Sequence, residues 1–111
     1  MTAAILALLA EQPKPKLSER SILVYPRLLE HTSDPFLHEL IRRRRDQGVE
    51  RHGEDLYSHN GRRPRADAIQ ELIDAAFYLQ QWDIEGSDRS VEIRRVLKLI
   101  RDISPEYRIA G

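Results

Sequence analysis

Apolar residues recur at the spacing of an amphipathic helix after Asp34, which begins the first clearly periodic stretch of the chain. Asp34 followed by Pro35 is typical of a helix start, and Gly53 predicts the end of the helix. One side of this helix, over about residues 35–52, is expected to face the core. That side carries Phe36, Leu37, Leu40, Ile41 and the stem of Arg44.

Two further helices are predicted by the same periodicity, over about residues 66–82 and 88–103. The apolar side of the first consists of Ile69, Leu72, Ile73, Ala76 and Leu79. The apolar set of the second is Val91, Ile93, Val96, Leu97, Ile100 and Ile103. Strand alternation and internal repeats are not evident, so the pattern predicts an all-α protein.

Turn-forming residues separate the first two of these helices. Asn60-Gly61 and Pro64 indicate a loop over residues 54–65 that reverses the chain. We therefore expect the helices on either side of it to be roughly antiparallel.

The first 33 residues are less periodic. Residues 1–16 contain an apolar stretch followed by Pro13 and Pro15, and we interpret them as an arm or linker that begins as a short helix or a mobile segment. Residues 17–33 are apolar without a clean period, which is consistent with either a short helix or an extended segment. The predicted organisation is an arm over residues 1–16 and a single domain over residues 17–111.

Composition adds expectations about partners and location. A chain of 111 residues builds only a modest core, so we expect it to self-associate. Its 18 basic and 18 acidic side chains cancel, so no global field attracts nucleic acid or a membrane surface. The eight apolar residues near the start are too few to span a bilayer. The absence of cysteine is compatible with a reducing cytosol, and cytoplasmic localisation is the expectation.

Each of the first two predicted helices has an acidic face. Glu39, Arg43, Asp46 and Glu50 share one side of the first helix, and Asp67, Glu71, Asp74 and Tyr78 share one side of the second. Carboxylates on one face repel unless they are solvated, paired with arginine or neutralised by a divalent cation. A solvated surface is the ordinary explanation. If the two faces meet, however, their oxygen ligands suit Mg²⁺.

The acidic residues also carry a family resemblance. Asp46-Gln47-x-x-Glu50 followed by Glu71-x-x-Asp74 resembles the E-E-x-x-E and E-x-x-D signature of MazG-like nucleotide pyrophosphohydrolases. The surrounding sequence, from the arginine-rich helix through RHGEDLYSHNGRRPRADAIQELIDAAFYL, is similar to short, often phage-encoded members with an N-G-R turn before the second acidic helix. The resemblance covers residues 35–82. It implies an antiparallel helical bundle of the MazG-like type, dimeric or tetrameric, and the host cytoplasm if the protein is phage-encoded.

The resemblance also implies an activity and a set of ligands. The family hydrolyses (deoxy)nucleoside triphosphates to monophosphate and pyrophosphate with Mg²⁺, for which Mn²⁺ is a candidate substitute. Glu50, Glu71 and Asp74 then become metal ligands and catalytic residues, and Asp46 stands where the family has its first glutamate. Gln47 departs from the family, which has glutamate there, and Asp67 is a candidate additional ligand.

In the mechanism implied by the resemblance, metal-bound water attacks the α-phosphorus. Mg²⁺ neutralises the charge that develops on the phosphate oxygens and on the departing pyrophosphate. A carboxylate that is not fully committed to metal orients the water as general base.

Several other side chains are candidates for contacting the substrate. Arg43, on the acidic face, is a candidate for a phosphate contact or for an internal salt bridge with Glu39. Arg62, Arg63 and Arg65 precede a helix N-terminus, where free amides favour anions, although an ordinary surface loop explains this turn equally well. The resemblance places Asn60 and Arg62 nearest the nucleotide, while Arg63 stands where the short relatives have an acidic residue.

Tyr78 has two open interpretations. It lies on the acidic side of its helix, where it would hydrogen-bond a ligating carboxylate or stack on a base, and an interface role is equally compatible with its position.

The leading prediction is an oligomeric Mg²⁺-dependent enzyme acting on (d)NTP, with two alternatives. One is a nucleic-acid-binding module that uses the arginine-rich helix and turn, against which the neutral net charge and the acidic faces argue. The other is a catalytically inactive relative that binds nucleotide and has lost the glutamate at position 47.

Overall fold

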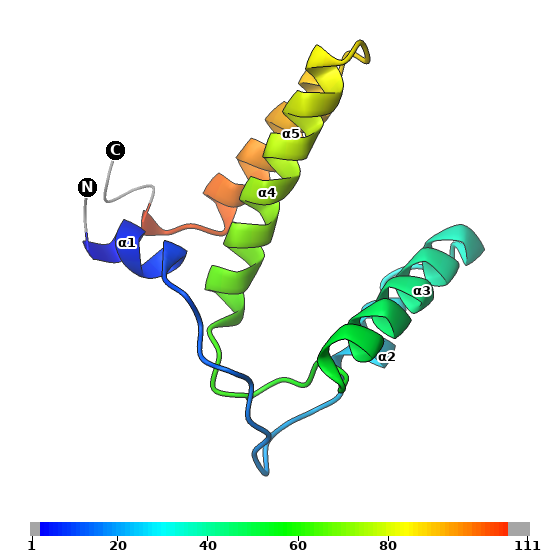
Figure 1. Ribbon diagram of the computed structural model, residues 1–111, viewed down its shortest axis with the longest axis vertical. Helices are drawn as coiled ribbons and strands as arrows, with labels where there is room; N and C mark the ends of the chain where they lie inside the picture. Colours follow the sequence, from blue (N-terminus) through cyan, green and yellow to red (C-terminus); the bar gives the residue numbers. More distant parts are fainter. Residues whose placement is uncertain (1–2, 107–111) are drawn as a thin grey trace. The chain divides into compact units, whose positions relative to one another are not determined.

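The protein is mostly helical in the part that the computed structural model describes, residues 3–106, and no β-strand is found there (Figure 1). Its helices are α1 (Ala3–Leu9), α2 (Val24–Leu29), α3 (Pro35–His52), α4 (Pro64–Ile84) and α5 (Ser90–Asp102). None of these helices is both long enough and apolar enough to cross a bilayer.

Contacts divide the chain into two compact units. Residues 14–61 form one, called here the α3 unit, and described residues 3–13 and 62–106 form the other, called the α4 unit. Residues 3–13, which belong to the predicted arm over residues 1–16, group with α4. The single domain over residues 17–111 stays a prediction.

Local sequence signals determine both ends of α3. The side chain of Asp34 accepts a hydrogen bond from the Phe36 N–H at 2.9 Å, and Pro35 occupies the first turn. At the other end Gly53 has a φ of 81°, in the left-handed region that favours glycine, and its N–H donates to the Val49 carbonyl at 2.7 Å. The predicted start and end of this helix are confirmed.

The residues before α3 are partly helical and partly extended. Pro26 lies in the first turn of α2, where a missing N–H costs nothing because those groups have no partner inside the helix. The His38 ring donates from Nε2 to the carbonyls of Leu29 and Thr32, which ties α2 to α3.

An extended segment ahead of α2 runs along the loop that follows α3. The Lys16 N–H donates to the Asn60 carbonyl at 2.8 Å, and the Ser58 N–H donates to the Ile22 carbonyl at 2.8 Å. Leu23 and Tyr57 form an isolated antiparallel bridge. The loop between α3 and α4 is therefore non-helical, as predicted, and is held by the segment before α2.

The expected core side of α3 is largely exposed, which corrects the sequence-based prediction. Phe36 is 67% exposed, and Leu37 and Leu40 are also exposed. The helix that packs against α3 within its unit is α2, whose six residues are too few to cover the eighteen of α3.

The core of the α4 unit lies where α1, α4 and α5 meet. Leu8, Ala66 and Ile69 are buried there, and Ile73, Ile100 and Ile103 pack against them. Gln70 donates from Nε2 to the carbonyls of Leu8 and Ala10, so it satisfies carbonyls at the end of α1. The N-terminal residues thus form a packed helix joined to α4 by hydrogen bonds.

The apolar sides of α4 and α5 match the prediction only in part. Ile69 is buried as predicted, while Val91 and Leu97, which we expected in the core, are exposed. Phe77 and Ile84 are also exposed, at 72% and 76%. Within residues 3–106, the apolar side chains that α1 helps to bury lie at the start of α4, whereas α5 is the helix with the most contacts to α4.

Candidate functional site

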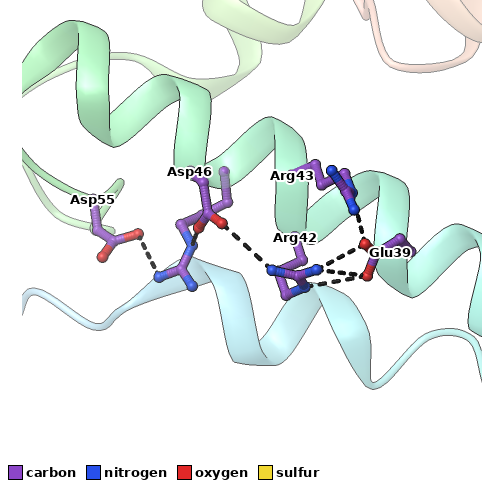
Figure 2. Close-up of polar contacts among 6 residues, drawn as sticks. Glu39, Arg42, Arg43, Asp46 and Asp55 are labelled. Carbon is purple, nitrogen blue, oxygen red and sulfur yellow. Dashed lines mark hydrogen bonds and ion pairs between the residues drawn. The ribbon is translucent and has the colours of Figure 1, made fainter.

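The arginine run of α3 is largely neutralised by carboxylates on the same helix (Figure 2). Arg42 donates from Nη2 to both oxygens of Glu39, at 2.7 and 2.8 Å, and Arg43 donates from Nε to Glu39 at 2.6 Å. These pairs are three and four residues apart, which places them on neighbouring turns. The hydrogen bonds from Arg42 and Arg43 lower the pKa of Glu39. Of the two roles predicted for Arg43, the internal salt bridge with Glu39 is present.

Arg45 connects three segments of the α3 unit. Its guanidinium lies over the ring of Tyr25 at 4.3 Å from the centroid, and its Nε is 3.0 Å from Asp46 Oδ1. Its Nη1 is 3.6 Å from Asp55 Oδ1 in the loop after α3. Sequence reasoning singled out neither Tyr25 nor Asp55. Because these partners are far from Arg45 along the chain, no local spacing indicated them.

Glu50 is the carboxylate of the α3 acidic face that has no internal partner. Asp46 is paired with Arg42 and Arg45, whereas within residues 3–106 the exposed side chain of Glu50 makes no hydrogen bond or ion pair. Gln47 accepts a hydrogen bond from Arg44 at 3.0 Å. An open depression of about 310 Å³ runs over this face, lined by Arg42, Arg43, Asp46, Gln47 and Glu50.

The acidic face of α4 shows the same division between paired and unpaired carboxylates. Both oxygens of Asp67 accept hydrogen bonds from Arg62, at 3.0 and 2.8 Å. Glu71 and Asp74 are exposed, and neither makes a hydrogen bond or an ion pair with any residue of the described chain. A cation at Asp67 would have to displace Arg62, whereas Glu71 and Asp74 are open to one. Tyr78 is exposed on the same side of α4.

The arginines of the turn before α4 are engaged in the α4 unit. Arg62 also donates from Nη1 to the Pro13 carbonyl at 2.7 Å. Arg65 forms a two-point ion pair with Glu106, at 2.7 and 2.8 Å, which lowers the pKa of the Glu106 carboxyl and raises the pKa of Arg65. Both arginines, predicted as phosphate contacts, would have to exchange these partners to reach a substrate.

Four of the five predicted metal ligands occur as two pairs, one on each helix, and the fifth, Asp67, is paired with Arg62. Asp46 and Glu50 are four residues apart on α3, and Glu71 and Asp74 are three apart on α4. Among residues 3–106, no group of three or more Asp, Glu or His side chains is arranged to hold a metal ion. Exposed carboxylate oxygens suit a hard cation such as Mg²⁺, which tolerates few protein ligands and keeps several waters. The meeting of the two helices at one ion stays a prediction.

The α3 unit also contains a pocket of about 500 Å³ that sequence reasoning missed. It lies between the extended segment near Lys14, the second half of α3 and the loop from Glu54 to Asn60. Asn60, a predicted substrate contact, lines it and is 7% exposed. One signal was visible in the sequence: Gly48 lies inside a helix, where glycine costs about 0.5–1 kcal/mol relative to alanine.

Comparisons with protein-family models, curated proteins and solved structures find no match to this chain.

Proposed function

We propose that the protein is a Mg²⁺-dependent nucleotide pyrophosphohydrolase that converts (d)NTP to (d)NMP and pyrophosphate. The proposal joins the resemblance of residues 35–82 to MazG-like enzymes with one observation about the acidic faces. Glu50, Glu71 and Asp74, the three residues that the resemblance assigns as catalytic ligands, are exposed and unpaired within the described chain. Their neighbours Glu39, Asp46 and Asp67 are paired with arginine.

The unpaired carboxylates are the part of this arrangement that favours a cation. Glu71 and Asp74 are one turn apart, and like charges at this spacing destabilise a helix by about 0.2–0.5 kcal/mol per pair. Neighbouring arginines relieve the equivalent repulsion at Asp46 and Asp67. A divalent cation would relieve it at Glu71 and Asp74.

The chain's own residues have distinct roles in the proposed reaction. Glu71 and Asp74, with Glu50, would hold Mg²⁺, which supplies positive charge against the triphosphate and makes a coordinated water more acidic. A carboxylate oxygen that is not used as a ligand would orient the attacking water and take its proton. The water oxygen bonds to the α-phosphorus as the bond to the bridging oxygen breaks, and pyrophosphate leaves. Arg42 and Arg43 would bind the phosphates by exchanging Glu39 for phosphate oxygens.

The alternative of an arginine-rich nucleic-acid-binding module receives less support. Arg42, Arg43 and Arg45 form ion pairs with carboxylates of the α3 unit. Phosphate binding by the run would therefore have to compete with these carboxylates. A run of four arginines does not make a strongly basic surface when three of the four are paired with carboxylates.

The reaction is tested with purified protein and each NTP and dNTP, with and without Mg²⁺ or Mn²⁺. Monophosphate and pyrophosphate are expected only when the divalent ion is present, because the charge of the triphosphate is otherwise unopposed near the carboxylates. Separation of the products distinguishes this outcome from release of diphosphate and phosphate, which would contradict the proposal. Nucleotide binding without turnover under all conditions would favour the catalytically inactive relative. The loss of activity would then be attributed first to Gln47, which stands where the family has glutamate.

We also propose that two or more copies of the chain associate. Phe77 and Ile84, seven residues apart and therefore on one side of α4, are among its most exposed apolar side chains. A solution of the purified protein always contains further copies of the chain, so a second copy is the partner that we propose for this side of α4.

Self-association is measured by light scattering after gel filtration. The wild type is expected at a multiple of its 13.0 kDa chain mass, and Phe77→Arg is expected to shift it toward the monomer because a charge would be buried in the interface. Ala68→Arg, at an exposed position in the first half of α4, adds the same charge elsewhere and should not change the mass. A monomeric wild type, or equal behaviour of the two variants, would contradict the proposal.

A further inference from the structure

The pocket of the α3 unit has the dimensions of a small-molecule site. Its volume of about 500 Å³ lies within the range of about 300–1,000 Å³ that such sites occupy. Arg45, Gly48, Val49 and His52 line it from α3, at the i, i+3, i+4, i+7 spacing of one helix side. The opposite wall is held by the hydrogen bonds between residues 16–24 and 56–60, so the pocket is formed by the fold of this unit alone.

Gly48 is not required by the packing of the chain. A Cβ built at this position would meet nothing within 4 Å. Neither close packing nor an unusual backbone conformation therefore explains a glycine inside α3, which weakens the helix. The missing side chain leaves open the helix side that faces the pocket. A ligand bound in the pocket would explain both the glycine inside α3 and the open helix side next to it.

The wall chemistry indicates what that ligand is. Leu17, Val49 and Leu56 provide apolar surface, which suits the face of a heteroaromatic ring. Tyr57 and Asn60 add polar groups to the same wall, which suits a ring with a mixed polar edge such as a nucleobase.

The position of the pocket connects it to the acidic face of α3. Val49 lines the pocket, and the next residue along α3, Glu50, lines the depression on the acidic face. We infer that the pocket binds the nucleoside part of the substrate, with the base against Val49 and Leu56 and the phosphates extending toward Glu50. This inference rests on the proposed function for the identity of the ligand. The pocket itself does not depend on metal or on α4.

The test is a titration of uniformly ¹⁵N-labelled protein with the common nucleosides and deoxynucleosides, without phosphate or divalent ions. At least one of them is expected to give saturable shifts at the amides of Gly48, Val49, Tyr57 and Asn60. Gly48→Leu would fill the pocket and is expected to weaken this binding by at least about tenfold. The same substitution should raise the melting temperature, because leucine is the better helix former. Lost binding combined with gained stability is not an outcome of misfolding.

Two variants separate this inference from the proposed reaction. Gly48→Ala adds a single methyl group and should weaken binding less than Gly48→Leu, while Arg51→Leu, on α3 but outside the pocket, should not change it. The inference is overturned if no nucleoside produces saturable shifts at the pocket, or if Gly48→Leu binds as the wild type does. Hydrolysis by Gly48→Leu with unchanged KM and base preference would overturn the inference and leave the proposed reaction standing. Nucleoside binding at the pocket without hydrolysis of any NTP supports the inference and overturns the reaction.

Discussion

Replacement of Glu71 by glutamine or of Asp74 by asparagine is expected to reduce Mg²⁺-dependent hydrolysis of the preferred nucleotide by about 100- to 1,000-fold. Each change keeps the size of the side chain and removes the negative charge that would hold the ion. Both side chains are exposed and have no partner in the described chain, so no folding contact is lost. Relief of the repulsion between them should stabilise α4 slightly, by about 0.2–0.5 kcal/mol.

The measurement combines initial rates over a range of Mg²⁺ concentrations with thermal unfolding of each variant. Glu85→Gln is the matched control, because Glu85 is an exposed carboxylate just beyond the end of α4 and outside the acidic face. It should hydrolyse substrate at the wild-type rate. If Glu71→Gln or Asp74→Asn retains near wild-type activity, the acidic face is only a solvated surface and the proposed site is wrong.

Replacement of Leu8 by alanine is expected to destabilise the α4 unit by about 2–5 kcal/mol, the usual cost of truncating a buried leucine. Leu8 is 6% exposed and packs with Ala66 and Ile69, so its removal leaves a cavity under α1. Small domains are stable by about 5–15 kcal/mol in total, so a large share of the stability would be lost.

Urea unfolding followed by the fluorescence of Trp82, the one tryptophan of the chain, reports on this unit directly. Leu6→Ala is the control: Leu6 is on the same helix but is 57% exposed, and its truncation should change the stability by no more than about 0.5 kcal/mol. Equal effects of the two substitutions would mean that α1 does not contribute to the core.

Local signals predicted the parts of the fold that depend on neighbours in sequence. Asp34, Pro35 and Gly53 mark the ends of α3, because capping involves residues within one turn of each other. The pairing of Glu39 with Arg43 follows from the same short range. The start of α4 was predicted two residues late, at Ala66, since Pro64 was taken as a loop residue rather than as the first residue of the helix.

Periodicity alone did not reveal which apolar sides the chain covers. It assigned Phe36, Leu37 and Leu40 to a core, yet these side chains are exposed because no long helix of the same unit packs against α3. It also gave no indication that α1 joins α4. Burial depends on the partner surface, which a wheel of one helix does not contain.

The candidate site also has one part that the sequence predicted and another part that depends on the tertiary structure. The sequence by itself determined that the regular structure of residues 3–106 is α-helical, and it placed Glu50, Glu71 and Asp74 on helix faces, because helix geometry relates residues three and four apart. The tertiary structure decided which charges are neutralised. Arg65 pairs with Glu106 and Arg45 pairs with Asp55, and in both cases a loop brings together residues that no local spacing relates. It also decided that Gly48 faces a pocket. Contacts between distant segments form only when the whole unit folds, so their chemistry could not be predicted from spacing.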